Sequence, residues 1–261
     1  MGMKFNNFIY CIIFFVSMNC GGKSVDVEED LSSNFNKALK FFNNEKYSRA
    51  RDEFEYIIKL DPGSQLANES QYYKGESLFK IKEYDESWIT FDRYIRFSND
   101  ITKIEKSRYR ICECAILSSN SYQRDQKQTK RALKQLQMFI EDFPTSTLIQ
   151  SAEKSIIELR YKLAKKEYEV GRLYLKLEEY ESALIYFRSV LNSYYDTEYA
   201  DEARIGIIFS HILNENRKGA KRYLKAEKDR FLKSEKYSLA ESLILETESG
   251  FKLHHYYQLY K

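Results

Sequence analysis

Small and aromatic residues recur along this chain at a spacing that is helical. In three segments an aromatic residue is followed by a small residue, then by Phe, and then by a large apolar or aromatic residue, each three or four positions after the last. These positions are Tyr47, Ala50, Phe54 and Ile57; Tyr84, Ser87, Phe91 and Tyr94; and Tyr180, Ala183, Phe187 and Val190. Because residues three or four positions apart lie on one face of an α-helix, the pattern predicts an amphipathic helix in each segment.

Each of these predicted helices follows an earlier helix, which carries a small residue and a larger residue three positions later. The pairs are Ala38 and Phe41, Gly75 and Leu78, and Gly171 and Tyr174, and a further pair that begins another unit is Gly206 and Phe209. Small residues let two helices approach closely, and the larger ones fill the gap to the next pair. Pro62 and Pro144 end two helices of the second kind, because Pro cannot continue a helix.

This arrangement resembles the tetratricopeptide repeat (TPR), a helix–turn–helix unit of about 34 residues. We expect an all-α fold, a right-handed solenoid of about five such repeats, with a concave groove suited to peptides or protein domains. The third repeat has an insertion at 118–128, the fourth opens with a long helical run, and the fifth is degenerate, as terminal repeats tend to be. The predicted solenoid covers residues 31–245, divided into 31–64, 68–101, 104–146, 148–197 and 199–245.

Composition supports the helical interpretation and excludes several classes of protein. Only 11 of the 261 residues are Pro or Gly, too few for the turns of an all-β sandwich or barrel. A hydrophobic content of 43% excludes a wholly disordered chain. With 42 Lys and Arg against 39 Asp and Glu, the net charge is only +3. We therefore expect no nucleic-acid partner, since such proteins usually carry a clear basic excess.

The N-terminus has the features of an export signal with a lipid attachment site. Residues 1–19 contain a basic start and the apolar run Phe8–Val16, which is too short to span a bilayer and is typical of a signal peptide. The following Val-Ser-Met-Asn-Cys resembles a bacterial lipobox, which predicts lipidation of Cys20 and a lipid-anchored protein on the periplasmic face of the outer membrane. The alternative is an ordinary cleaved signal with an incidental cysteine. Residues 20–30 are expected to form a flexible tether, and 246–261 a C-terminal tail.

No motif of a catalytic, nucleotide-binding or metal-binding site is present. The sequence contains no P-loop, GxGxxG, HExxH or GxSxG motif. Cys112 and Cys114 lie two positions apart in a helical stretch, so their side chains point to different faces and are predicted to be packed free thiols. We therefore predict a protein that is not an enzyme and needs no metal or cofactor.

Two stretches resemble the BamD family, the lipoprotein subunit of the outer-membrane β-barrel assembly machine (the BAM complex). They are Asp92-Arg93-Tyr94-Ile95-Arg96, and the run from Pro144-Thr145-Ser146 through Leu163-Ala164, Glu167, Val170-Gly171 and Tyr174 to Tyr180, Ala183 and Asp196-Thr197. The resemblance implies a scaffold that binds the POTRA domain of a BamA-like barrel protein and engages unfolded outer-membrane protein substrates. The membrane would be contacted through the lipid anchor.

The same resemblance implies four partner-binding candidates. Family members have an arginine where this chain has Tyr186, and Arg188 could replace it, although helical geometry turns Arg188 about 200° away. Arg93 and Arg96 are candidates either for structural salt bridges, which we favour, or for the surface that engages substrates. A second interpretation of the whole chain is a generic periplasmic TPR lipoprotein that tethers cell-wall or division proteins.

Overall fold

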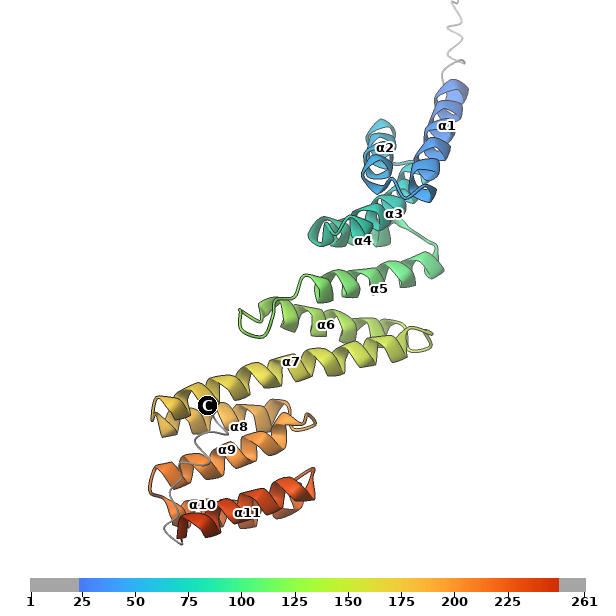
Figure 1. The fold of residues 1–261 in the computed structure, drawn as a ribbon. Helices are drawn as coiled ribbons and strands as arrows, with labels where there is room; N and C mark the ends of the chain where they lie inside the picture. The colour runs from blue at the N-terminus through green and yellow to red at the C-terminus, as the bar shows by residue number, and fades with distance from the viewer. Residues whose placement is uncertain (1–23, 249–261) are drawn as a thin grey trace, which may run out of the picture.

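The computed structural model describes residues 24–248, and this part of the chain is a stack of α-helices (Figure 1). The helices are α1 (Ser24–Asn43), α2 (Tyr47–Leu60), α3 (Gln65–Lys80), α4 (Tyr84–Phe97), α5 (Ile101–Leu117), α6 (Lys127–Asp142), α7 (Ile149–Lys176), α8 (Tyr180–Ser193), α9 (Tyr199–Leu213), α10 (Arg217–Glu227), η1 (Lys228–Arg230, a 3-10 turn) and α11 (Ser234–Glu248). Helices α1 to α10 pack mainly against their neighbours in the chain, whereas α11 packs mainly against α9. The stack is elongated, with α1 at one end and α10 and α11 at the other (Figure 1). The predicted all-α fold is confirmed.

Four helix pairs are joined by the same three-residue turn, whose middle residue has a positive φ. These middle residues are Glu45, Lys82, Glu178 and Glu215, with φ between 55° and 67°. At the third of these turns the N–H of Glu178 donates to the carbonyl of Leu175 (3.1 Å), and the N–H of Glu179 donates to that of Tyr174 (3.0 Å). Such a pair of bonds is a Schellman motif, which satisfies carbonyls at a helix end and redirects the chain. The helix–turn–helix unit is therefore built by one recurring device.

Within the units, glycine allows a phenylalanine ring to pack directly on a helix backbone. A Cβ atom placed on Gly75 would lie 2.8 Å from the ring of Phe91, and one on Gly171 or Gly206 would lie 2.7 Å from the ring of Phe187. Both rings are fully buried. Real Cβ atoms essentially never approach a ring so closely. The close helix approach predicted at these glycines is thus present in the core.

The α5–α6 pair departs from this pattern, because an insertion separates its helices. The connection between Leu117 and Lys127 runs past α7, whose lysines hold it. Lys162 Nζ donates to Ser119 Oγ (2.7 Å), and Lys166 Nζ donates to the carbonyl of Gln123 (3.1 Å). Helix α7 is the longest described helix, at 28 residues, and its length brings these lysines to the insertion.

The C-terminal end contains three helices where the sequence predicted one degenerate pair over 199–245. Helix α11 is joined to the stack by a buried polar network centred on Asp201. Its carboxylate accepts hydrogen bonds from the backbone N–H groups of Leu232 (3.0 Å) and Lys233 (2.9 Å) and pairs with Arg204 (3.0 Å). Arg204 in turn contacts Glu227 at the end of α10 (3.2 Å). The network fixes the turn that leads into the additional helix.

The N-terminal boundary also differs from the expectation. Helix α1 begins at Ser24, so residues 24–30 are helical where the sequence predicted a flexible tether. The acidic composition that suggested a linker also suits the first turns of a helix, where the macrodipole favours negative charge. The predicted signal peptide, Cys20 and residues 249–261 lie outside the described residues. Within 24–248 no helix has the length and apolar character needed to cross a membrane.

The two cysteines of α5 are packed as free thiols. Cys112 and Cys114 are each 1% exposed. Burial raises the pKa of Cys112 to about 12 and that of Cys114 to about 11. Because the thiolate is the reactive form, both side chains are chemically inert at neutral pH.

Candidate functional site

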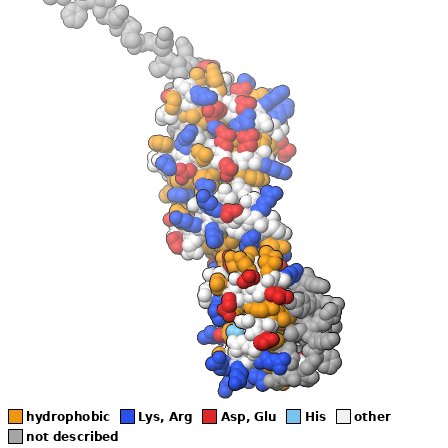
Figure 2. Space-filling model, turned by 90° about the vertical axis from the view of Figure 1, so that its left-hand side faces the viewer, with side chains coloured by type: hydrophobic (Ala, Val, Ile, Leu, Met, Phe, Trp, Pro, Cys, Tyr) orange, Lys and Arg blue, Asp and Glu red, His pale blue; other side chains and the backbone are white. Residues whose placement is uncertain are grey.

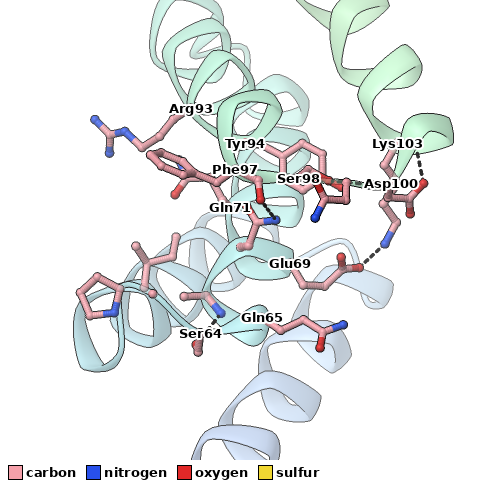
Figure 3. Close-up of a pocket in the computed structure, with 16 residues that line it drawn as sticks. Ser64, Gln65, Glu69, Gln71, Arg93, Tyr94, Phe97, Ser98, Asp100 and Lys103 are labelled. Carbon is pink, nitrogen blue, oxygen red and sulfur yellow. Dashed lines mark hydrogen bonds and ion pairs between the residues drawn. The ribbon is translucent and has the colours of Figure 1, made fainter.

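The N-terminal half of the stack contains a solvent-accessible cavity of about 1010 Å³ (Figure 3). Its walls come from the α2–α3 turn, the first half of α3, the C-terminal end of α4 and the start of α5. Pro62 follows the end of α2, and Ser64 caps α3 by accepting a hydrogen bond from the N–H of Ala67 (3.0 Å). The residues that stop one helix and start the next thus shape one wall of the cavity.

Two amide side chains tie the floor of this cavity to α4. Gln71 Nε2 donates to the carbonyl of Thr90 (3.3 Å), and Asn68 Nδ2 donates to that of Phe97 (3.4 Å). Gln71 is only 5% exposed. A buried amide needs such partners, because an unpaired polar group in the interior costs free energy. The floor of the cavity is therefore pre-formed and carries polar groups alongside apolar ones.

A partly buried ion pair forms the opposite side of the cavity. Lys103 of α5 pairs with Glu69 of α3 and lies 5.4 Å from the ring centroid of Tyr72 (Figure 3). Burial lowers the pKa of Lys103, but its hydrogen bond to Glu69 and the nearby charge raise it more, so the pKa lies above its usual value. For the phenol of Tyr94, which lines the cavity from α4, burial raises the pKa. The ammonium group and the phenol are thus both fully protonated at neutral pH.

The structure separates the two arginine candidates of α4. Arg93 is exposed and lines the cavity, where Figure 3 shows its guanidinium on the side away from the Glu69–Lys103 pair. Arg96 instead pairs with Asp92 one turn earlier on the same helix (2.6 Å). Phe97, one turn after Arg93, also lines the cavity and is 74% exposed. Arg93 and Phe97 therefore offer a cation and an apolar ring at the cavity edge.

A second cavity, of about 790 Å³, lies further along the stack between α3, α5 and the α6–α7 turn. Arg110 of α5 is held there by Glu76 (2.8 Å) and Glu113 (2.7 Å) and lies 4.5 Å from the ring centroid of Phe79. Burial lowers the pKa of Arg110, but the two carboxylates raise it more, so the pKa lies above its usual value. The charges of Arg110, Glu76 and Glu113 therefore satisfy one another within this cavity.

The C-terminal candidates lie on different sides of α8. Tyr186 stacks on Tyr174 of α7, with ring centroids 5.3 Å apart and planes 14° from parallel. Arg188 is exposed and lines a third cavity, between α8 and α10, that Tyr186 does not reach. The 200° separation expected from helical geometry is consistent with this difference.

Several site residues could not be singled out from the sequence. Gln71, Asn68 and Lys103 are ordinary polar residues of a helix pattern, and only the stacking of three helices brings them to one cavity. Phe97 could have been noticed in the sequence, because a large apolar residue at the end of a helix has no place in the repeat register. Within 24–248 no group of three His, Cys, Asp or Glu side chains is placed to hold a metal ion. The mixture of polar and apolar groups in the first cavity is suited to binding polypeptide.

Comparison with known proteins gives one family match. The model of the family YfiO, described as outer membrane lipoprotein, matches residues 28–225. The outer membrane protein assembly factor BamD of Rickettsia prowazekii is 23% identical over 235 residues, covering 89% of this chain and 94% of the relative. The BamD of Neisseria meningitidis serogroup B is 23% identical over 193 residues, covering 69% of this chain and 72% of the relative.

Solved structures similar to this chain include MamA and YrrB. MamA of Desulfovibrio magneticus RS-1 is 13% identical and covers 77% of this chain and 94% of its own, with a TM-score of 0.35. YrrB, described as a TPR protein with an unusual peptide-binding site, is 17% identical and covers 84% of this chain and 95% of its own, with a TM-score of 0.34.

Proposed function

This chain belongs to the YfiO family of outer membrane lipoproteins, whose relatives include BamD assembly factors, and from this premise we propose that it is the lipid-anchored TPR scaffold of a BAM complex. The BamD family consists of non-catalytic assembly factors. The observation that carries the proposal is the family match over residues 28–225, which spans both candidate surfaces. Its mechanism is binding: one end holds the partner barrel protein and the other holds a substrate segment.

The N-terminal cavity is the proposed site for an unfolded substrate segment. An extended segment has free backbone groups and alternating apolar side chains, so it needs polar and apolar contacts together. The cavity combines exposed Phe97 with the Arg93 guanidinium and hydrogen-bonded amides in its wall. Its volume of about 1010 Å³ accommodates several residues of such a segment.

A matched pair of variants tests this site. Phe97 and Ile101 are both 74% exposed, but only Phe97 lines the cavity. Phe97→Ser should weaken binding of a urea-unfolded barrel protein about tenfold, the scale of one lost apolar anchor, while Ile101→Ser leaves it unchanged. Binding is measured by fluorescence anisotropy after dilution from urea. Equal losses in both variants would place the substrate elsewhere.

The C-terminal repeats are the proposed contact for the POTRA domain of a BamA-like protein. Leu173 and Leu177 lie one turn apart at the end of α7, with 53% and 60% of their surfaces exposed, next to the Tyr174–Tyr186 stack. Exposed apolar and aromatic side chains of this kind form the centres of protein interfaces. Tyr186 is therefore proposed to contribute by packing, in place of an ion pair.

Affinity capture tests the partner assignment. The tagged chain should recover a BamA-like barrel protein from solubilised membranes, and Leu177→Glu should abolish that recovery because it buries a charge at the contact. Ile157→Glu, at a residue 67% exposed on the first half of α7, is the matched control. Recovery of cell-wall hydrolases or division proteins, without any barrel protein, would instead support the generic tethering function.

Lipidation of Cys20 is proposed on the lipobox resemblance. Cys20→Ser should remove fatty-acid labelling and release the chain from the membrane fraction at high salt. Retained labelling would show that the acyl group is attached at another residue.

A further inference from the structure

The positive charge of this protein is concentrated at one end of the solenoid. Residues 217–236, covering α10, η1 and the start of α11, contain nine Lys or Arg and three Asp or Glu, a net charge of +6. The whole chain carries only +3, so the remainder is net negative. Figure 2 shows Lys and Arg side chains gathered at the lower end of the molecule, where Figure 1 places α10 and α11. The excess is therefore local and lies far from α1.

The exposed face of α10 is almost purely cationic. Its apolar side, with Ala220 and Leu224, is buried in the stack. Its exposed basic residues are Arg217, Lys218, Lys221, Arg222 and Lys225. For Arg217, Lys218, Arg222 and Lys225 the described residues supply no carboxylate within ion-pair distance. This face thus presents uncompensated charge to a partner.

Beside this face lies the third cavity, of about 520 Å³, which is also built from cations. Arg188 of α8, Arg204 of α9 and Arg230 of η1 line it, and among its described lining residues Glu227 is the one carboxylate. Glu227 is already held by Arg204 (3.2 Å) and Arg230 (2.8 Å). Arg188 has no carboxylate partner among residues 24–248, so the cavity retains unsatisfied positive charge.

One residue that lines the cavity has a buried hydroxyl group without a hydrogen-bond partner among the described residues. The Oη atom of Tyr223, which lines the cavity from α10, is buried and makes no hydrogen bond with any described residue. Burial is the main cause that raises the pKa of this phenol, so it remains a hydrogen-bond donor. Buried polar groups in native proteins are nearly always satisfied. An acceptor supplied by a ligand would complete this site.

At the mouth of the cavity, exposed apolar groups accompany the charges. Tyr195 is 63% exposed and Leu232 is 57% exposed, and both line the cavity. The exposed Lys233 follows Leu232 in the chain, and the exposed Lys228 begins η1. Aromatic and aliphatic side chains beside lysines are typical of surfaces that lie at a membrane interface. The combination favours a ligand that carries an oxyanion next to apolar material.

We propose that the C-terminal end of the solenoid is a second membrane contact, in which the cavity between α8 and α10 binds the phosphate of an anionic phospholipid headgroup. Arg188 and Tyr223 contact the phosphate, and the α10 face supplies the long-range attraction. Lys and Arg side chains near an anionic surface add to the membrane binding of a lipid-anchored protein. This inference rests on membership of an outer membrane lipoprotein family and is independent of the POTRA contact.

The test uses the full mature chain with Cys20→Ser, so that no acyl group contributes. The chain should co-sediment with vesicles of phosphatidylcholine plus phosphatidylglycerol at low ionic strength, and not with phosphatidylcholine vesicles. Tyr223→Phe removes only the unpartnered hydroxyl and leaves the charge and the fold intact. It should weaken binding about tenfold or more, the scale of one hydrogen bond to a charged group.

Two arginine variants distinguish the phosphate contact in the cavity from the long-range attraction by the α10 face. Arg217→Gln, on the exposed face of α10, should weaken binding about fivefold, as expected for one basic residue near an anionic membrane. Arg188→Gln should weaken it more than Arg217→Gln, because the phosphate contact is lost as well. Wild-type binding by Tyr223→Phe, or equal losses for the two arginine variants, would overturn the cavity assignment. Tight binding of inorganic phosphate in the cavity would overturn the lipid assignment. Binding of an oligoglutamate peptide by a chain that does not bind vesicles would overturn it as well.

Discussion

Replacing Gly206 with alanine should destabilise this protein, although alanine is the better helix former. Gly206 lies inside α9, where the propensity difference alone favours alanine by about 1 kcal/mol. However, the new Cβ would stand 2.7 to 2.8 Å from three atoms of the Phe187 ring. That ring is fully buried and also packs on Gly171, so it cannot move aside without displacing a helix.

The magnitude follows from these two opposing contributions. Overpacking a well-packed core costs about 1–3 kcal/mol, which exceeds the gain in helix propensity. Because the new Cβ would meet three ring atoms, we expect a cost in the upper part of this range, about 2–3 kcal/mol. Subtracting the propensity gain leaves a net loss of about 1–2 kcal/mol for Gly206→Ala, and a Tm lower by roughly 2–8 °C for a chain of this size. Gly63→Ala is the control, because a Cβ at Gly63 meets no atom within 4 Å and its free energy of unfolding should change by less than about 1 kcal/mol.

A double-mutant cycle identifies the ring as the cause. Phe187→Leu destabilises the chain by itself through the cavity it leaves, but it removes the ring atoms that the new Cβ at position 206 would meet. The cost of Gly206→Ala should then disappear or change sign. The assay is urea unfolding followed by circular dichroism, with the slope of the transition checked because repeat proteins need not unfold in two states. A stable Gly206→Ala protein, or an equal loss in the Phe187→Leu background, would refute the close-packing argument.

Three further predictions concern single groups. Lys82→Gly should raise the free energy of unfolding by about 0.5–1 kcal/mol, because Gly adopts the positive φ of 67° without the left-handed penalty; urea unfolding measures it. Cys112 and Cys114 should resist alkylation by iodoacetamide at pH 8 in the folded protein and react fully in urea, as mass spectrometry would report, since burial raises both pKa values. Burial, with the nearby Arg188 charge, lowers the pKa of His211 below 6.5, so the unfolded chain takes up its proton first. Stability should therefore fall as pH drops below about 6.5, and His211→Gln should flatten that dependence in thermal melts at different pH.

At the candidate surfaces, the sequence alone does not determine the neighbours of each side chain. Arg93 and Arg96 are three residues apart and equally basic, yet one lines a cavity and the other pairs with Asp92. Tyr186 and Arg188 are two residues apart, and the structure gives them different neighbours. The sequence marks these segments as candidates, but the role of each side chain depends on which residues of the neighbouring helices lie beside it.

The amino-acid sequence by itself determined the helices and how they pair. Helical periodicity depends on spacings of three and four residues, and the contact of Gly171 with Phe187 spans sixteen residues. Both can be inferred from the sequence, because a single helix or a single turn between two helices sets each distance. Only the tertiary structure decided the cavities, the network of Asp201 and the unpartnered hydroxyl of Tyr223. Those features bring together side chains from helices whose relative positions depend on the geometry of several intervening turns. Small differences in each turn accumulate, so no local pattern records where distant residues will meet.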